Sequence, residues 1–391
     1  MPGIKDRVAI AGVGATRFTE HYEKDHEDLI CEAVDEALGD AGVARGDIQA
    51  IWAGIYYQFT GLGGPAVADP LKMYGIPVTR VENYCASGMD AFRNACFAVA
   101  AGVYDIVLAC GVEKITDQGS RGLPNVREGA HPFLPPASAP AMFAMSATRC
   151  FDVHGWTKED LARVAVKNHA NGAKHPKAHF RRAITMEDAV NAPEIASPLG
   201  RFDCCAVSDG AAAVVITRPE IARTMKHKDD FVVVKANGLS VETANPMYKP
   251  GFEYLGFPAT QTASRAAYDE AGITDPFEQI DLAEVHDCFT ITELLNYEDL
   301  GFCKKGEGAA FVRDGLSAPD GPLPVNPSGG LKSFGHPIGA TGCRMITEVA
   351  RQLQGRAEGV QVKDPKIGLA HNLGGPGAVS SVTILGRNDT L

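Results

Sequence analysis

One pattern in this chain occurs twice. Residues 36–43, an apolar helical segment ending in Ala-Gly, are followed after a short turn by the apolar run 47–51. The same order returns at residues 266–273 and 279–283, at an offset of roughly 230 residues. Two copies are too few for a solenoid, so the pattern predicts a duplicated unit whose halves join near residues 226–230.

Apolar runs of strand length alternate with helical patterns in both copies. This alternation favours an α/β fold with a mostly parallel sheet that helices cover on both faces. Strands are predicted at residues 8–13, 48–55, 103–111, 231–234, 280–285 and 367–370, and helices at 29–42, 85–101, 264–272 and 340–353.

The pattern breaks between about Thr116 and Phe202, around a single predicted helix at 159–174. We therefore predict a first half at 1–115 and 203–228, an inserted loop or lid domain at 116–202, and a second half at 229–391. Insertions this long are usually functional. Basic residues in it either meet a phosphate or lie in solvent: Lys167, Lys174, Lys177, Arg181 and Arg182. Its aromatic residues and methionines either line an acyl pocket or pack a small core, and we favour packing for most of them: Phe133, Met142, Phe143, Met145, Phe151 and Trp156.

Composition excludes several classes of function. The net charge of −11 gives no general attraction to nucleic acid or anionic lipid. The ten cysteines include no CxxC pair, so the usual zinc and thioredoxin spacings are missing. No apolar run approaches the ~18 residues of a membrane span, and residues 1–20 lack the apolar core of a signal peptide. We expect a cytoplasmic protein with reduced cysteines and no metal.

Cys85 is the first candidate for chemistry. It lies between a predicted strand and a predicted helix, and a helix N-terminus favours the thiolate, which is the nucleophilic form of cysteine. The small residues that follow leave room for a substrate carbonyl. The alternative is a small buried apolar residue, the more frequent role of a lone cysteine.

Three further segments carry candidate groups. His286 and Cys288 follow a predicted strand and could face one cleft, where the thiol would move a proton to or from carbon. The alternatives are a buried pair or part of a metal site. His336 lies in a glycine-rich loop that corresponds, in the second half, to the position of Cys85 in the first. The duplication therefore predicts that Cys85 and His336 meet near a pseudo-twofold axis. The glycine loop at 371–377 has backbone amides that could stabilise an oxyanion.

Taken in order, these segments resemble the thiolase superfamily over residues 8–385, nearly the whole chain. The Cys85-Ala86-Ser87 box, the Gly335-His336-Pro337 box and the closing glycine loop are shared with thiolases generally. The His286-Asp287-Cys288-Phe289 box and the pair His371-Asn372 are similar to the sterol-carrier-protein-type branch. That branch lacks the second cysteine that other thiolases carry in the final loop, and His371 stands at that position.

The resemblance implies a five-layered αβαβα thiolase fold, normally dimeric, with coenzyme A as acyl carrier. It implies that Cys85 takes the acyl group from a 3-oxoacyl-CoA while His336 accepts the Cys85 proton and helps form a first oxyanion hole. His286 would hold the thioester oxygen of the enolate. Cys288 would protonate the departing acetyl-CoA enolate, or generate it in the condensing direction.

A second oxyanion hole is implied around the acyl-cysteine. It would combine the N–H of Cys85 with one from about Leu373 or Gly374. The chemistry also places demands on the two thiols, because Cys85 needs a lowered pKa to attack and Cys288 needs one near neutral pH to exchange a proton.

The leading hypothesis is a CoA-dependent C-acyltransferase of lipid metabolism. It would cleave a 3-oxoacyl-CoA to acyl-CoA and acetyl-CoA, or run the reverse Claisen condensation, as a homodimer or a dimer of dimers. One alternative is a retro-aldolase of steroid side-chain degradation, which the retention of Cys85 and Cys288 disfavours. Another is a subunit that needs a small zinc-ribbon/OB-fold partner, as in thiolases for aromatic acyl-CoA substrates.

Overall fold

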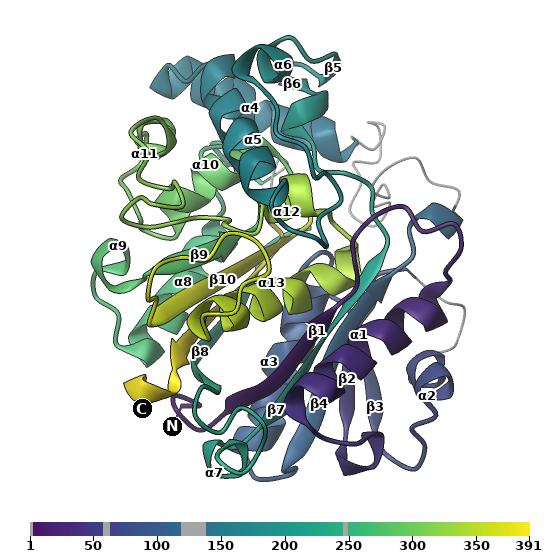
Figure 1. The fold of residues 1–391 in the computed structure, drawn as a ribbon. Helices are drawn as coiled ribbons and strands as arrows, with labels where there is room; N and C mark the ends of the chain where they lie inside the picture. The colour runs from purple at the N-terminus through teal and green to yellow at the C-terminus, as the bar shows by residue number, and fades with distance from the viewer. Residues whose placement is uncertain (1–2, 58–62, 119–137, 245–248) are drawn as a thin grey trace.

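The structure is a computed structural model that describes residues 3–57, 63–118, 138–244 and 249–391 (Figure 1). Phe133 lies outside the described residues. Within them, nine strands form one continuous sheet. In spatial order the strands are β3 (Val78–Val81), β2 (Ile51–Gly54), β4 (Ile106–Glu113), β7 (Gly210–Thr217), β1 (Ala9–Ala15), β8 (Val232–Val241), β11 (Val379–Arg387), β10 (Ile367–Gly374) and β9 (Leu282–Val285).

The sheet is mixed, so the predicted mostly parallel sheet is wrong. Three neighbouring pairs are parallel, namely β3–β2, β2–β4 and β10–β9. The other five pairs are antiparallel, because β7 and β11 each run antiparallel to both of their neighbours and β1 meets β8 antiparallel. The β1–β8 register is short and joins only Ala9 and Ile10 to Val233 and Val232.

The predicted duplication is confirmed by topology. The strands β2-β4-β7-β1 of the first half correspond, in this order, to β9-β10-β11-β8 of the second. In place of β3, the second half has a single parallel bridge from Ala283 to Val325. The outer helices α1 (His26–Ala41) and α8 (Pro258–Ala271) also correspond. Both end at a glycine in the left-handed conformation, with φ of 72° at Gly42 and 80° at Gly272.

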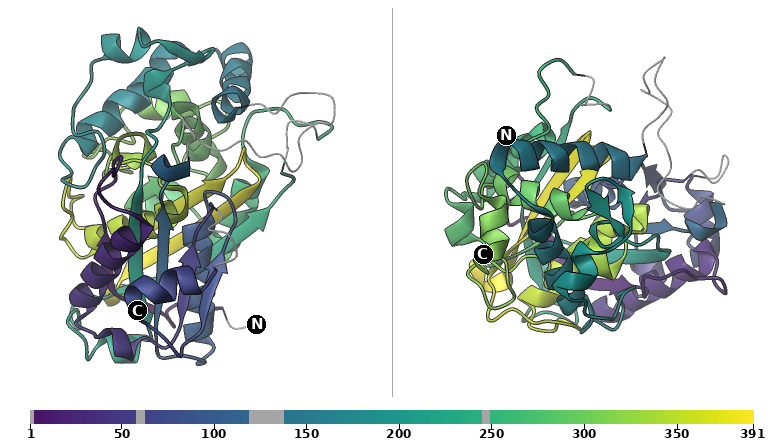
Figure 2. Two further views of the ribbon diagram at one scale, coloured as in Figure 1. Left: turned by 90° about the vertical axis from the view of Figure 1, so that its right-hand side faces the viewer. Right: turned by 90° about the horizontal axis from the view of Figure 1, so that it is seen from above.

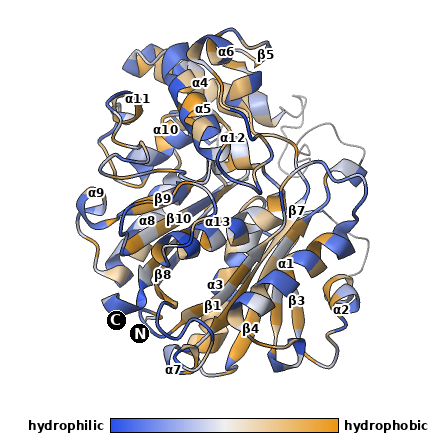
Figure 3. Ribbon diagram, viewed as in Figure 1, coloured by the Kyte–Doolittle hydropathy of each residue, from blue (hydrophilic) through white to orange (hydrophobic). Residues whose placement is uncertain are grey.

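Two helices form the middle layer between the halves of the sheet. These are α3 (Ser87–Ala100) and α13 (Ile338–Leu353), and α13 is buried along its whole length. They approach closely because Gly88 has no side chain: a Cβ there would lie 2.4 Å from the Gly339 carbonyl oxygen. With α1 and α8 outside, the five-layered αβαβα architecture is confirmed, and Figure 3 shows apolar residues concentrated in the strands.

The insertion forms its own group of elements at one end of the sheet, whereas both termini lie at the other (Figures 1 and 2). Its predicted helix is α5 (Lys158–Gly172), preceded by a helix that the sequence did not predict, α4 (Ala139–His154). Phe143 and Trp156 are buried in the main core and Met145 is 43% exposed, whereas Met142 and Phe143 also line a cavity together with Cys85. The insertion also contains α6 (Met186–Val190), β5 (Glu194–Ala196) and β6 (Leu199–Gly200).

Shorter helices fill the remaining connections: α2 (Pro65–Leu71), α7 (Pro219–Ala222), α9 (Pro276–Gln279), α10 (Thr290–Asp299), α11 (Gly308–Arg313) and α12 (Gly330–Phe334). None of the helices in the described ranges combines the length and apolar character needed to cross a bilayer.

Candidate active site

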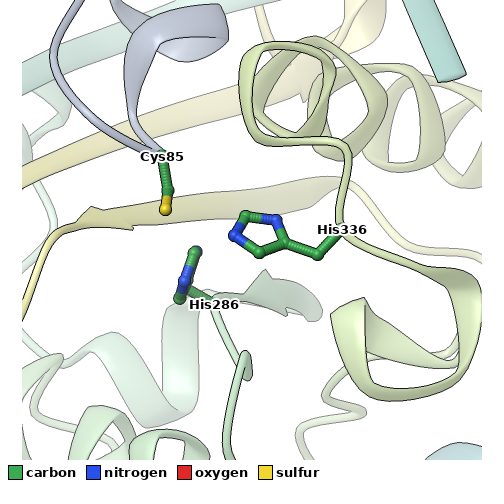
Figure 4. Close-up of side chains that lie close together, drawn as sticks. All are labelled: Cys85, His286 and His336. Carbon is green, nitrogen blue, oxygen red and sulfur yellow. The ribbon is translucent and has the colours of Figure 1, made fainter. Parts of the chain in front are cut away.

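Cys85 lies on a tight turn between β3 and α3. Tyr84, just before it, has a φ of 50°, a left-handed conformation that costs free energy for a residue with a side chain. Ser87 holds the turn, because its hydroxyl donates to the Tyr84 carbonyl at 2.5 Å and accepts from the Asn83 N–H at 2.9 Å. The turn presents the Cys85 sulfur to the second half of the molecule (Figure 4).

Two imidazoles from the second half meet this sulfur. The Cys85 Sγ and one ring nitrogen each of His286 and His336 all lie within 4.8 Å of one another (Figure 4). His286 directly follows β9 and His336 directly precedes the N-cap of α13, so the predicted meeting of Cys85 and His336 is confirmed. One sulfur and two nitrogens at this spacing are also donors that zinc accepts. The expected absence of a metal cofactor stays a prediction.

The neighbours of the two histidines give them opposite tautomers. The Thr341 hydroxyl donates to the Pro337 carbonyl at 2.9 Å, so its oxygen accepts from His336 Nδ1–H at 2.7 Å. His336 Nε2 then carries the free lone pair, and it has no hydrogen-bond partner among the described residues. In contrast, the Asn372 amide donates to His286 Nδ1 at 3.0 Å, which leaves His286 with an Nε2–H donor.

Burial sets the resting charges of the site. It raises the pKa of the Cys85 thiol to about 12 and lowers the pKa of His336 to about 3. It also holds the pKa of His286 well below its usual range, with a further contribution from His336. Burial thus raises the pKa of Cys85 where a lowered one was expected, because desolvation outweighs the hydrogen bonds from the N–H groups of Gly375 and Cys85. Proton transfer from Cys85 to His336 leaves the pair neutral overall, so it can accompany nucleophilic attack.

The amide that meets Cys85 is not the predicted one. Leu373 and Gly374 still belong to β10, where they pair with Ser380 and Val379 of β11. The N–H of Gly375, the next residue, interacts with the Cys85 thiol and moves its pKa downward, as does the N–H of Cys85 itself. The expected position of the second amide is therefore one residue too early, because the strand continues past residue 370.

His371 does not face the site. Successive side chains of a strand point to opposite faces, so Asn372 reaches His286 while His371 points toward the outer layer. There His371 Nε2 lies 3.1 Å from both the Thr260 hydroxyl of α8 and the Ser380 hydroxyl of β11. The side chain of His371 therefore lies outside the site, and Asn372 occupies the position that faces the chemistry.

Cys288 shares a small cavity with Cys85. The cavity measures about 50 Å³, and His286, Met142 and Phe143 also line it. Phe143 also stacks on Phe289, with ring centroids 4.7 Å apart. Burial raises the pKa of Cys288 well above its usual range, so the expected near-neutral pKa is wrong. Cys288 rests as a thiol, the form that donates a proton.

A buried carboxyl ties the two halves together beside the site. Glu113, at the end of β4, accepts hydrogen bonds from the backbone N–H groups of Tyr56 and Tyr57, each at 3.0 Å, and of Gly339 at 2.9 Å. Gly339 lies three positions after His336 at the start of α13. Glu113 therefore fixes the base-bearing loop relative to the first half, although no sequence motif singled it out.

A much larger cavity of about 860 Å³ lies next to the small one, and Ala139 lines both. Most of its wall comes from the insertion, and its cationic residues are Arg182, Arg201 and Lys332. Of the basic residues singled out in the sequence, only Arg182 lines it. Lys167 and Lys177 instead form ion pairs with Glu293 and Glu36.

The fold and site together define a class of enzyme that transfers acyl groups through a cysteine. Family models agree: "Thiolase, N-terminal domain" matches residues 8–220 and "Thiolase C-terminal domain-like" matches residues 251–387. The chain belongs to the thiolase family. The predicted family, fold and enzyme class, an acyltransferase, are thereby confirmed.

Curated relatives agree with this assignment. The chain is 40% identical to an acetyl-CoA acetyltransferase of Methanothermobacter thermautotrophicus, over 97% of this chain and 99% of the relative. It is 32% identical to sterol carrier protein 2 of Bos taurus, over 96% of this chain and 72% of the relative. It is 34% identical to benzoylsuccinyl-CoA thiolase subunit BbsB of Thauera aromatica, over 95% of this chain and 96% of the relative.

A solved structure of the "Ltp2-ChsH2(DUF35) aldolase" is also similar. It superposes with a TM-score of 0.87 at 28% identity, covering 99% of this chain and all of the other. The same family scaffold thus occurs in proteins described as acetyltransferases and in one described as an aldolase.

Proposed function

We propose that the protein is a CoA-dependent C-acyltransferase that cleaves a 3-oxoacyl-CoA, or forms one by Claisen condensation, through an acyl group on Cys85. The observation that carries this proposal is that two imidazoles in opposite tautomers lie beside one thiol. His336 offers a lone pair that can take the Cys85 proton, and His286 offers an N–H that can hold a developing oxyanion.

In the first step the Cys85 sulfur attacks the ketone carbon of the 3-oxoacyl-CoA as its proton passes to His336 Nε2. The amides of Cys85 and Gly375 are placed to hold the tetrahedral oxygen. The carbon–carbon bond then breaks and its electron pair leaves as the acetyl-CoA enolate, whose oxygen His286 Nε2–H stabilises. Cys288 protonates the enolate carbon, and acetyl-CoA departs.

In the second step the thiol of a new CoA attacks the acyl-Cys85 carbonyl as its proton passes to the Cys288 thiolate, which restores the Cys288 thiol. The Cys85–carbonyl bond breaks, acyl-CoA leaves, and Cys85 regains a proton from His336. The cavity of about 50 Å³ around the sulfur favours a short acyl group such as acetyl. The larger cavity beside it, with its cationic wall, is the proposed site of CoA.

Thr341 determines which nitrogen of His336 is free, so it provides a test of this mechanism. Thr341→Val keeps the shape but removes the acceptor for Nδ1–H, which lets the proton move to Nε2. We expect acylation of Cys85 by acetyl-CoA to slow by about 10- to 100-fold. Rapid-quench mass spectrometry measures that rate, and Thr341→Ser, which keeps the hydroxyl, should react almost normally. Equal rates for Thr341→Val and the parent protein would contradict the assigned tautomer.

A specific observation supports one alternative, in which activity depends on a partner subunit. The similar aldolase structure includes a DUF35 component in its name, and the wide cavity is built mainly from the insertion, where a partner could complete it. We expect the purified chain alone to cleave acetoacetyl-CoA when CoA is added. If the purified chain is inactive by itself but active with a zinc-ribbon/OB-fold protein, its activity depends on a partner. Cleavage of a steroid β-hydroxyacyl-CoA without CoA would instead establish the retro-aldolase.

Three finer points belong to the same proposal. A homodimer is supported by β3, which pairs with β2 on one side and has no strand on its other edge among the described residues. A reducing cytoplasm is supported by the ten cysteines, all of which are free. A role in lipid metabolism rests on the 3-oxoacyl-CoA substrate.

A further inference from the structure

Lys332 is a buried lysine with no anionic partner at hydrogen-bonding distance among the described residues, and burial lowers its pKa. Its side chain is 1% exposed, and its ammonium has no hydrogen bond or ion pair with any residue that the structure describes. Burying a charge in this way is unfavourable unless another group compensates it. Lys332 lies in α12, four positions before His336 in the sequence, and it does not line the small cavity that contains Cys85.

The surroundings of Lys332 contact it but do not neutralise it. The ammonium nitrogen lies 5.5 Å from the ring centroid of Phe180 and 5.9 Å from that of Phe202, which are cation–π distances. The nearby carboxylates are engaged elsewhere. Asp287 accepts from the backbone N–H groups of Leu331 and Lys332, and Asp203 accepts from the Thr290 hydroxyl and pairs with Lys158.

Lys332 also lines the large cavity, together with both of those phenylalanines. The two arginines of the cavity wall, Arg182 and Arg201, are exposed to solvent, whereas Lys332 is buried. A solvated arginine attracts anions weakly, but a buried ammonium forms a strong charge-assisted hydrogen bond. The cavity wall therefore combines one buried lysine with two exposed arginines and one exposed carboxylate, that of Asp188.

We propose that the ammonium of Lys332 binds an oxyanion of the substrate, a carboxylate or a phosphate, inside the large cavity. This inference rests on the proposed CoA-thioester substrate. The two sources of the anion are a carboxylate at the far end of the acyl group and a phosphate of CoA itself. The two sources can be distinguished with ligands that lack either the carboxylate or the phosphate, because the loss of Lys332 should weaken the binding only of ligands that carry the anion.

Equilibrium binding separates this inference from the proposed function. Titration calorimetry in a Cys85→Ala background involves no turnover, so it gives an answer whether or not the chain is a thiolase. The probes are glutaryl-CoA, which carries a terminal carboxylate, valeryl-CoA, which has the same chain length without one, and pantetheine, which lacks phosphate. Lys332→Met is the test variant. Lys174→Met, an exposed lysine of the insertion that does not line the cavity, is the matched control.

If the anion is the acyl carboxylate, Lys332→Met should weaken the binding of glutaryl-CoA at least about tenfold and leave the affinity for valeryl-CoA within about twofold. If the anion is a CoA phosphate, both thioesters should weaken at least about tenfold, whereas pantetheine should not change. Unchanged binding of all three probes would overturn the inference. If Lys332→Met does not fold, reductive methylation of the parent protein replaces this test. Bound ligand should protect Lys332 from methylation. Equal labelling of Lys332 with and without ligand would overturn the inference.

Discussion

Replacing Cys85 by alanine is expected to lower kcat/KM for thiolysis of acetoacetyl-CoA by at least about 10,000-fold, because the acyl group is transferred to the Cys85 sulfur. Cys85 is the only sulfur that meets both imidazoles among the described residues, since Cys288 rests against Thr292, 4.0 Å from its hydroxyl oxygen. Steady-state assays of purified variants measure the loss.

The control for this experiment is Cys31→Ala, which removes a half-buried cysteine of α1 whose thiol donates to the Pro70 carbonyl. It should keep the parent activity. A Cys85→Ala protein that cleaves acetoacetyl-CoA at the parent rate would exclude an acyl-enzyme on Cys85.

Replacing Cys288 by alanine is expected to separate the two half-reactions. Condensation of acetyl-CoA should fall by about 1,000-fold, because no other described group in the small cavity is placed to remove a proton from the acetyl carbon. Acylation of Cys85 by acetyl-CoA should remain within a few-fold of the parent, since that step uses His336. Exchange of the acetyl methyl protons with heavy water, followed by NMR, reports directly on Cys288.

Cys303→Ala is a suitable control, because Cys303 is half-buried and lies outside both cavities. It should exchange protons like the parent. If Cys288→Ala still exchanges the methyl protons at the parent rate, another group is the acid and base, and the role assigned to Cys288 is wrong.

Sequence patterns predicted the parts of the site that depend on duplication. Equivalent loops of the two halves carry Cys85 and His336, so a pseudo-twofold relation alone brings them together. His286 and Cys288 could also be predicted from the sequence, because they come just after a strand whose end faces the same cavity. The position of a residue after a strand is a local property that a sequence reveals.

The remaining features depend on tertiary contacts that a sequence does not display. The glycines after Leu373 suggested an early turn, but pairing with β11 extends β10 to Gly374 and thereby turns His371 away and Asn372 inward. Thr341 is an ordinary helix residue in the sequence, and only its distance to His336 reveals its role. A helix N-terminus suggested a thiolate, whereas the depth of the site determines the pKa of Cys85.

The central claim is that Cys85 carries the acyl group, and one measurement addresses it most directly. The Cys288→Ala protein is incubated with acetyl-CoA, quenched in acid, digested and analysed by peptide mass spectrometry. We predict one added acetyl group, located on the peptide of Cys85 and absent after hydroxylamine treatment. An unmodified Cys85 peptide from a protein that binds acetyl-CoA, or an acetyl group on another cysteine, would contradict the account.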